Sequence, residues 1–276
     1  MLIDTHTHFD LPVYDTDRET YMARAYQRGV RHLVLIGYEA RYFDRLVSTA
    51  RTMDGIAQKN PMATITPHLA PGLHPLYIAR HTPNDLATLE HYIKHDKVIA
   101  IGEIGLDTYP SDFNNIALLD KQKQFFSAQL ELASTYQLPV VLHIRKAHAD
   151  TLQLLKHHRF QGGGIAHSFS GGAQEAFAFI KQGFCLGLTG QLTNPNAKKL
   201  RRTVLAVLER FGLDYFVIET DCPDMTPITC QHLPVNEPST LPLIAQALAR
   251  LADCDIDHVT NKLWQNSCRA FSLTFN

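Results

Sequence analysis

Four histidines and two carboxylates of this 276-residue chain fall just after short apolar runs, where a parallel barrel presents its functional side chains. The six residues are His6, His8, Glu103, His143, His167 and Asp221. Imidazole nitrogens and carboxylate oxygens suit borderline divalent ions such as zinc, manganese or cobalt. One catalytic zinc typically uses three protein ligands, so six donors predict a pair of ions that share a carboxylate.

The spacing within this set has a physical reason. His6 and His8 lie two residues apart, so in an extended chain both imidazoles point to the same side and can reach one cation. Glu103 is the natural bridging residue, because a carboxylate offers two oxygens and its run lies midway along the chain. A hydroxide held between two ions would attack phosphorus or a carbonyl carbon, with Asp221 holding the nucleophile and shuttling its proton.

Each of these residues has an ordinary structural alternative when it is taken alone. An isolated His-x-His pair is more often a hydrogen-bonded strand end, Glu103 could cap a helix, and Asp221 before Cys222-Pro223 could be a turn residue. The prediction rests on their joint placement, because packing inside a barrel favours Val, Ile and Leu at such positions.

Two further residues are candidates for substrate contact or catalysis. Arg145 lies two residues beyond His143 and could bind a phosphate oxygen, or it could be a surface arginine at the start of a helix. His74 could face the substrate from the third apolar run, or it could orient the turn at the following proline. Supporting roles, with capping or charge pairing as the alternative, are predicted for Asp107, Glu219 and Asn236.

Eight apolar runs, each followed by an amphipathic stretch, have to position these side chains. They lack strict alternation, which is typical of parallel strands buried on both faces. The predicted strands are Leu2–Asp4, His32–Ile36, His68–Leu73, Val98–Gly102, Pro139–Leu142, Gly164–Ala166, Phe184–Leu188 and Tyr215–Ile218. Helices are predicted over Leu118–Tyr136, Lys198–Phe211, Leu241–Ala252 and Ile256–Phe271.

Local signals mark some of the helix ends. Thr16 and Glu19 have the spacing of a capping box, and Gly29, Gly183 and Gly212 are suited to C-terminal caps. Eight strand-helix units are the number that a closed barrel needs, and such barrels commonly reach ~250 residues as one domain. We therefore predict a TIM (β/α)8 barrel that spans residues 1–276 as a single domain. A doubly wound open sheet is the alternative, but no G-x-G-x-x-G sequence follows a strand.

Composition narrows the functional classes. The formal net charge of −1 argues against nonspecific coating of nucleic acid, although it leaves room for a local basic cleft. The five cysteines form no C-x-x-C pair, so a disulfide framework is not expected and a reducing compartment is. We find no signal peptide and no apolar stretch of 18 residues. The expectation is a cytoplasmic protein without a membrane partner, and a monomer, although the sequence does not fix the oligomeric state.

The sequence resembles the TatD family of metal-dependent hydrolases, and within it the YjjV-like branch. The motifs that carry the resemblance occur in family order: Asp4-Thr5-His6-Thr7-His8-Phe9-Asp10, Gly72-Leu73-His74-Pro75, Gly102-Glu103-Ile104-Gly105-Leu106-Asp107, His143-Ile144-Arg145, His167-Ser168-Phe169-Ser170-Gly171, Glu219-Thr220-Asp221-Cys222-Pro223 and Val235-Asn236-Glu237-Pro238. In combination they are highly specific, and they cover nearly the whole chain.

The resemblance implies a TIM barrel with two divalent ions, which could be zinc, manganese, cobalt or magnesium. It assigns one ion to His6, His8, Glu103 and Asp221, and the other to Glu103, His143 and His167. It also implies phosphodiester hydrolysis, as a deoxyribonuclease acting on DNA or RNA ends. The chain departs from the family at Thr108, where many members carry an aromatic residue, and at Val235, where many carry an arginine that could clamp a phosphate.

Two other functions stay open on the sequence alone. A binuclear hydrolase of carboxylic esters, lactones or amides would use the same hydroxide, although many such enzymes bridge their metals with a carboxylated lysine where this chain has Glu103. A metal-binding scaffold without catalysis is the third hypothesis, and the complete set of ligands argues against it.

Overall fold

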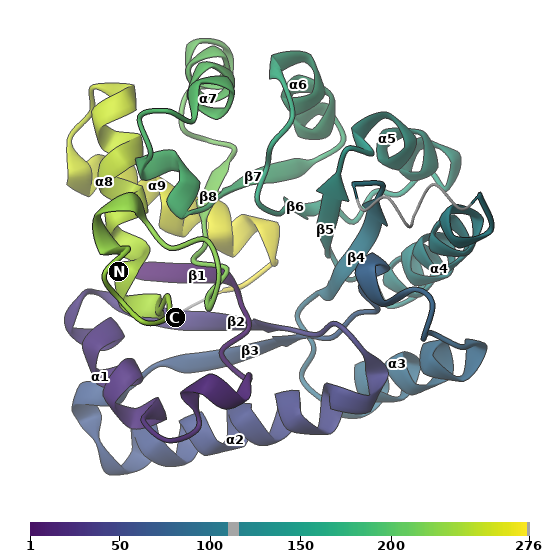
Figure 1. Ribbon diagram of the computed structural model, residues 1–276, viewed down its shortest axis with the longest axis horizontal. Helices are drawn as coiled ribbons and strands as arrows, with labels where there is room; N and C mark the ends of the chain where they lie inside the picture. The colour runs from purple at the N-terminus through teal and green to yellow at the C-terminus, as the bar shows by residue number, and fades with distance from the viewer. Residues whose placement is uncertain (110–115, 275–276) are drawn as a thin grey trace.

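Eight parallel strands alternate with helices in the computed structural model, which describes residues 1–109 and 116–274 (Figure 1). The strands are β1 (Leu2–Thr7), β2 (Val30–Ile36), β3 (Thr66–Ala70), β4 (Ile101–Asp107), β5 (Val140–Arg145), β6 (Gly164–Ala166), β7 (Phe184–Leu188) and β8 (Phe216–Ile218). The α-helices are α1 (Arg18–Gln27), α2 (Phe43–Lys59), α3 (Pro83–His95), α4 (Ile116–Thr135), α5 (His148–His157), α6 (Ala173–Lys181), α7 (Lys198–Phe211), α8 (Leu241–Ala252) and α9 (Ile256–Ala270).

The strands form two parallel ladders, β1-β2-β3 and β4-β5-β6-β7-β8, whose edges meet at two seams. At the β3/β4 seam the Ile99 N–H donates to the Leu69 carbonyl at 2.9 Å. At the β8/β1 seam the Asp221 N–H donates to the His6 carbonyl at 3.0 Å. These bonds close the ring, and the predicted (β/α)8 barrel is confirmed.

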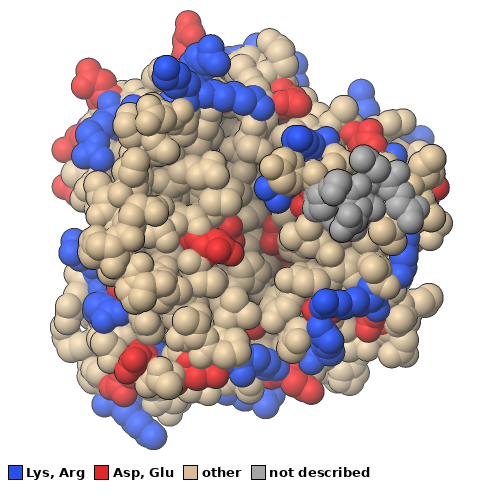
Figure 2. All heavy atoms as spheres, in the orientation of Figure 1, with Lys and Arg blue, Asp and Glu red and all other residues tan. Residues whose placement is uncertain are grey.

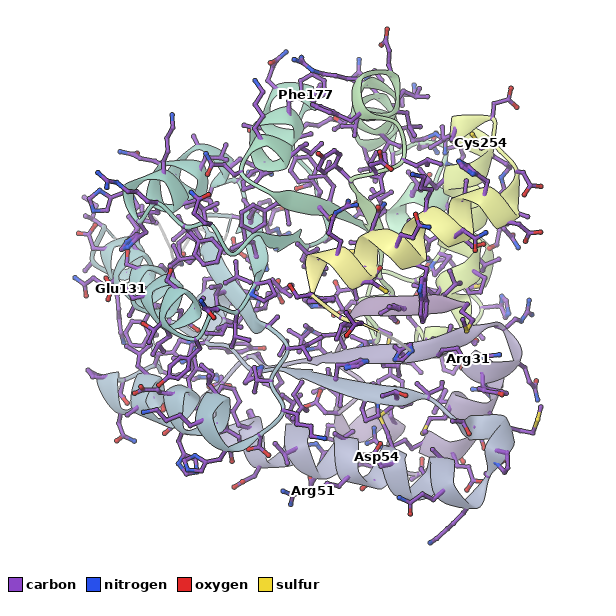
Figure 3. The ribbon with its side chains drawn as sticks, turned by 180° about the vertical axis from the view of Figure 1, so that it is seen from behind. Arg31, Arg51, Asp54, Glu131, Phe177 and Cys254 are labelled. Atoms are coloured by element: carbon purple, nitrogen blue, oxygen red, sulfur yellow. The ribbon has the colours of Figure 1, made fainter. Side chains whose placement is uncertain are left out.

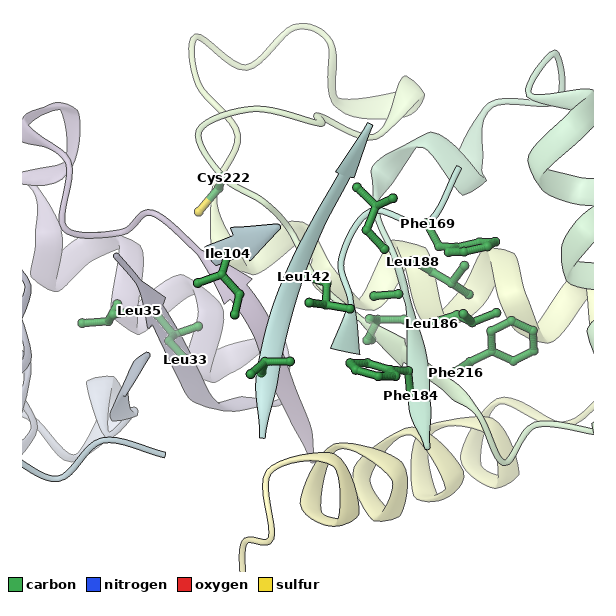
Figure 4. Close-up of a cluster of buried hydrophobic side chains, with 14 of the residues drawn as sticks. Leu33, Leu35, Ile104, Leu142, Phe169, Phe184, Leu186, Leu188, Phe216 and Cys222 are labelled. Carbon is green, nitrogen blue, oxygen red and sulfur yellow. The ribbon is translucent and has the colours of Figure 1, made fainter. Parts of the chain in front are cut away.

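Apolar side chains fill the barrel and also the layer between the strands and the helices. The interior cluster consists of Ile3, Val34, Ile36, Ala70, Ala100, Val141, Ile165, Cys185 and Val217, with Ala270 and Phe271 packed against it. Figure 3 shows α9 lying across this end of the barrel. The larger cluster lies outside the strands, and part of it, including Phe184 and Phe216, is drawn in Figure 4. The apolar base leaves the other end of the barrel for polar side chains.

Three strands extend further than their apolar runs predict. β4 runs from Ile101 to Asp107 rather than over Val98–Gly102, and β1 and β5 continue to Thr7 and Arg145. Their ends carry polar side chains that find polar partners at the barrel mouth, so the ladder continues where the apolar pattern has stopped. The bounds of β6, β7, α7 and α8 agree with the prediction.

The predicted capping box of the first helix is wrong. α1 begins at Arg18 after Asp17, and no side chain caps it. Glu19 instead accepts a hydrogen bond from the Asn60 side-chain amide at 2.8 Å. Its carboxylate therefore links the first turn of α1 to the residue that follows α2. Gly29, after this helix, has a φ of 89°, as expected of a C-terminal glycine.

No helix in the described ranges combines the length and the hydropathy that crossing a bilayer requires.

A histidine pair lies toward the base of the barrel. His32 Nδ1 of β2 and His68 Nε2 of β3 are 3.0 Å apart, and the His32 ring centroid lies 5.4 Å from that of Trp264 in α9. Burial lowers the pKa of both imidazoles to about 4, and their mutual repulsion adds to this effect for His32. Both side chains are therefore neutral in the folded chain at pH 7.

This pair predicts that stability falls as the pH drops. The unfolded state binds protons near pH 6.5 and the folded state only near 4, so the stabilisation is complete above pH 6.5 and is lost between these values. We expect the free energy of unfolding to fall by about 4 kcal/mol between pH 7 and 5, because each histidine of the pair contributes about 2 kcal/mol. Urea denaturation in EDTA should show a smaller fall in a His32→Gln/His68→Gln variant. An equal fall in both proteins would contradict the prediction.

Candidate metal centre

The carboxyl ends of the strands open onto a cavity of about 570 Å³. Its walls include seven of the eight site residues predicted from the sequence: His8, His74, Glu103, His143, Arg145, His167 and Asp221. His6 lies beneath them and is fully buried. Figure 2 looks onto this face and shows acidic atoms near its middle, with basic side chains mostly nearer the edge. The barrel thus brings together residues that are scattered over more than 200 positions of the sequence.

Glu103 on β4 lies at the centre of the group, with its two oxygens facing different imidazoles. Oε1 lies 2.7 Å from His143 Nδ1 and 3.8 Å from His167 Nε2. Oε2 lies 3.4 Å from the Nε2 atoms of both His6 and His74. Two sets of donors that could each hold a metal, His6-His8-Glu103 and His74-Glu103-His143, therefore have this carboxylate in common.

Asp221 approaches the same imidazoles from the end of β8. Its Oδ1 lies 3.5 Å from His6 Nε2 and 3.9 Å from His8 Nε2, and its Oδ2 lies 3.5 Å from His167 Nε2. The φ of Asp221 is 51°, a left-handed conformation that aspartate tolerates better than most residues. The rings of His6 and His167 stack at 3.5 Å between centroids, so the imidazoles are crowded as well as close to the acids.

Charge and burial compete at each of these groups. Burial by itself would raise the pKa of Glu103, but the surrounding imidazoles outweigh it and hold that pKa well below its usual range. Burial opposes the charge of His143, yet the Glu103 and Asp107 carboxylates raise its pKa to about 9. Burial and the neighbouring His167 lower the pKa of His6. The cluster therefore stabilises an ionised carboxylate at its centre.

The donor set fits a divalent cation. Both ring nitrogens of His6 and the Nδ1 atom of His8 are buried, and they make no hydrogen bond with any residue that the structure describes. Unsatisfied buried nitrogens are costly, and coordination of a cation would satisfy them. Imidazole and carboxylate donors without a thiolate match zinc, manganese or cobalt. The thiol of the neighbouring Cys222 is not part of this donor set, and it lies 2.8 Å from the Thr7 hydroxyl.

Another buried acid, Glu219, lies beside His167. The Oε1 atom of Glu219 is 2.9 Å from His167 Nδ1 and accepts a hydrogen bond from the Ser168 N–H at 2.6 Å. Its Oε2 accepts from the Thr5 hydroxyl at 3.2 Å. Gly187 leaves the room for this side chain, because a Cβ there would lie 2.2 Å from Oε1. Glu219 therefore orients His167 from inside the barrel.

Asp107 stands in the same relation to His143. Its Oδ2 lies 2.9 Å from His143 Nε2, and the side chain is fully buried. The Gln122 side chain of α4 holds the Asp107 backbone at both of its polar groups, at 2.9 and 3.0 Å. Two turns further along α4, the Gln129 side chain binds the backbone N–H and carbonyl of Leu73 in the same way, at 2.7 and 3.2 Å.

These two glutamines and Asp4 are site-supporting residues that the sequence analysis missed. Asp4 is fully buried and accepts hydrogen bonds from the Thr220 N–H at 2.9 Å and the Thr220 hydroxyl at 2.5 Å, which ties β1 to the residues after β8. Burial raises the pKa of Asp4 to about 7. The signal for Gln122 and Gln129 was their seven-residue spacing on the otherwise apolar buried face of α4.

The predicted substrate contacts have different outcomes. His74 does orient its turn, since its Nδ1 accepts from the Leu76 N–H at 3.0 Å, but its other nitrogen faces Glu103 and so belongs to the donor cluster. Arg145 is exposed at the edge of the mouth, where its guanidinium carbon lies 3.8 Å from the Tyr109 ring centroid. It also lines the cavity.

The segment after β8 is held by Asn236. Its side-chain amide donates to the Thr220 carbonyl at 3.0 Å and to the Asp224 carbonyl at 2.6 Å. Val235 beside it lines a separate surface cavity with Tyr21. The departure from the family at position 235 therefore lies away from the mouth.

Comparison with known proteins agrees with this geometry. The family model for TatD related DNase matches residues 3–272. The metal-dependent hydrolase YjjV of Escherichia coli is 32% identical over 98% of both chains. Its crystal structure superposes with a TM-score of 0.87 and covers 99% of this chain and 98% of that one, at 31% identity. A 3'-5' ssDNA/RNA exonuclease TatD from Erwinia amylovora is 28% identical over 93% of this chain and 94% of its own.

The match over nearly the full length, together with a mouth that gathers imidazoles around a central glutamate, identifies the chain as a member of the TatD family of metal-dependent hydrolases.

Proposed function

We propose that this chain is a binuclear metal-dependent phosphodiesterase that cleaves nucleotides from the ends of single-stranded DNA or RNA. The observation that carries the proposal is the placement of Glu103, whose two oxygens each face a different pair of imidazoles. The name of the Erwinia amylovora relative supports the nucleic-acid substrate. The recessed floor supports attack at an end, because Glu103 is only 2% exposed and an internal phosphodiester in a duplex would have to descend to it.

The distances support a ligand assignment. We assign one cation to His6, His8, Glu103 and Asp221, and the other to Glu103, His143 and His167, with His74 close enough to join the second. When bound, two such ions supply a nucleophilic hydroxide at neutral pH and positive charge for the phosphoryl oxygens. Zinc, manganese, cobalt and magnesium all remain candidates, and nitrogen donors favour the first three.

The protein groups have separate tasks in hydrolysis. Attack of water on phosphorus breaks one P–O ester bond, adds the oxygen to the phosphate and requires a proton to reach the leaving alkoxide. Asp221 is more exposed than Glu103 and lies at the cavity wall, so it can take the proton of the nucleophile and pass it to the leaving alkoxide. Arg145 at the rim can bind a phosphate oxygen of the incoming strand. Glu219 and Asp107 keep His167 and His143 in position.

Removal of the metal should abolish the activity. We expect EDTA treatment to stop the release of nucleotides from single-stranded oligonucleotides and manganese to restore it. Glu103→Ala should lose bound metal in elemental analysis and lower kcat/KM by at least ~100-fold, because several kcal/mol of charge stabilisation disappear. Glu131→Ala is the matched control, since this exposed glutamate lies on the outer helix α4.

The same purified protein should be assayed on carboxylic esters, lactones and amides. Cleavage of these substrates but not of oligonucleotides, lost in Glu103→Ala, would replace the phosphodiesterase proposal by the alternative hydrolase. A fully metal-loaded protein that cleaves neither class would contradict both and favour a metal-binding scaffold.

Loss of a supporting carboxylate should weaken metal binding without unfolding the barrel. Glu219→Gln and Asp107→Asn keep the shape of each side chain but remove the negative charge that orients a histidine. We expect roughly 10- to 100-fold weaker metal affinity, measured by competition with a chromogenic chelator. Thermal denaturation with metal removed reports on folding, and metal affinities equal to that of the unaltered protein would show that these acids do not support the ligands.

A further inference from the structure

Three tyrosines gather on one side of the mouth, and we call them the tyrosine cluster. Tyr38 follows β2, Tyr42 ends a short 3-10 helix (Ala40–Tyr42), and Tyr77 ends another (Pro75–Tyr77). The Tyr38 ring centroid lies 5.2 Å from that of Tyr42 and 5.6 Å from that of Tyr77. Tyr38 and Tyr77 border the mouth cavity, whereas Tyr42 does not.

The cluster lies directly beside the candidate metal ligands. The Tyr38 ring is 5.9 Å from the ring of His8, and the Tyr77 ring is 5.8 Å from that of His74. The remaining wall of the cavity is largely apolar and includes Leu11, Leu76, Pro223 and Met225. One cavity therefore joins a polar, metal-binding floor to an aromatic and apolar wall.

The two cavity tyrosines are held in place by bonds that do not involve their rings. The Tyr38 carbonyl accepts from the His74 N–H at 3.0 Å, which joins the two segments that carry Tyr38 and Tyr77. The buried carboxylate of Glu39 lies 2.8 Å from Arg41 Nη2 and 3.3 Å from Arg80 Nη1. Since both arginines are more than half exposed, cations also lie at the outer edge of the cluster. The wall is thus preformed.

We propose that Tyr38 and Tyr77 form a stacking subsite for the nucleobase at the strand end that is cleaved. This inference rests on the proposed phosphodiesterase function and adds the group that recognises its substrate. Aromatic rings stack on any base through its π-face, so such a subsite binds single strands with little sequence preference. A base against this wall leaves its phosphodiester at the polar floor of the same cavity.

The competing explanation is that the tyrosine rings serve packing alone. The position of each ring relative to the cavity distinguishes this explanation from a stacking subsite. Tyr38 and Tyr77 both border the 570 Å³ cavity beside the candidate metal ligands, whereas Tyr42, which packs against Tyr38, does not border it. A base-paired end has its base already stacked and paired, so it would have to open before it could occupy the subsite.

The test compares oligonucleotides that carry either a normal base or an abasic site at the terminal position, using the metal-loaded protein. We expect the base-bearing end to be cleaved with a kcat/KM roughly 5- to 100-fold higher, as the loss of one aromatic stacking contact predicts. Tyr38→Ala and Tyr77→Ala should remove this preference by slowing only the base-bearing substrate. Tyr77→Phe should keep it, and so should Tyr136→Ala, a tyrosine of the outer surface that binds Glu90.

Binding provides a second measurement that does not depend on turnover. The fluorescence of a terminal 2-aminopurine should be quenched when the oligonucleotide binds wild-type protein whose metal has been removed by a chelator. The Tyr38→Ala and Tyr77→Ala proteins, treated in the same way, should quench it less. Equal cleavage of both ends by the wild type, or equal slowing of both by the alanine variants, would overturn the stacking subsite while leaving the phosphodiesterase intact. If the wild type cleaves neither oligonucleotide, the proposed function fails, and the inference fails with it.

Discussion

The buried carboxylate of Glu103 is the interaction on which the rest of the mouth depends. A charged group that is 2% exposed needs several partners, and imidazoles on four other segments of the chain supply them. Each imidazole needs an orienting group in turn, which for His143 and His167 is another buried acid, Asp107 or Glu219. The mouth is thus an alternating network of acids and bases in which each member has a reason to be buried.

The fold was predictable from the sequence because barrel strands repeat a simple pattern. Apolar runs such as Phe184–Leu188 are buried on both faces and carry no polar function, so their bounds follow from composition alone. The prediction ended too early at β4 and β5, where Glu103 and His143 lie within the strands. A polar residue interrupts an apolar pattern whether it ends a strand or continues into a polar site, and local sequence cannot separate these cases.

The arrangement inside the site was less predictable than its membership. The positions of His6, Glu103 and Asp221 after apolar runs indicate that their side chains share one mouth with Glu103 between the donors. They do not indicate that His74 faces the same oxygen of Glu103 as His6. Asp4 reads as an ordinary member of its run, although its partner Thr220 is 216 residues away. The capping box at Thr16 failed for the same reason, because Glu19 has a tertiary partner. Long-range hydrogen bonds decide these cases, and no spacing within the chain encodes them.

Buried histidines have opposite pKa shifts at the two ends of the barrel. This contrast shows how the apolar base differs from the polar mouth. At the base, His32 lies beside His68 and Trp264, where burial lowers its pKa to about 4 and the side chain stays neutral. At the mouth, His143 is also shielded, but two carboxylates raise its pKa to about 9. Shielding alone therefore makes a histidine a packing residue, whereas shielding next to acids makes it part of a charged network. The buried acids Glu103 and Asp221 line the mouth, which is the end that α9 does not cover, so that end has the carboxylates a cation needs.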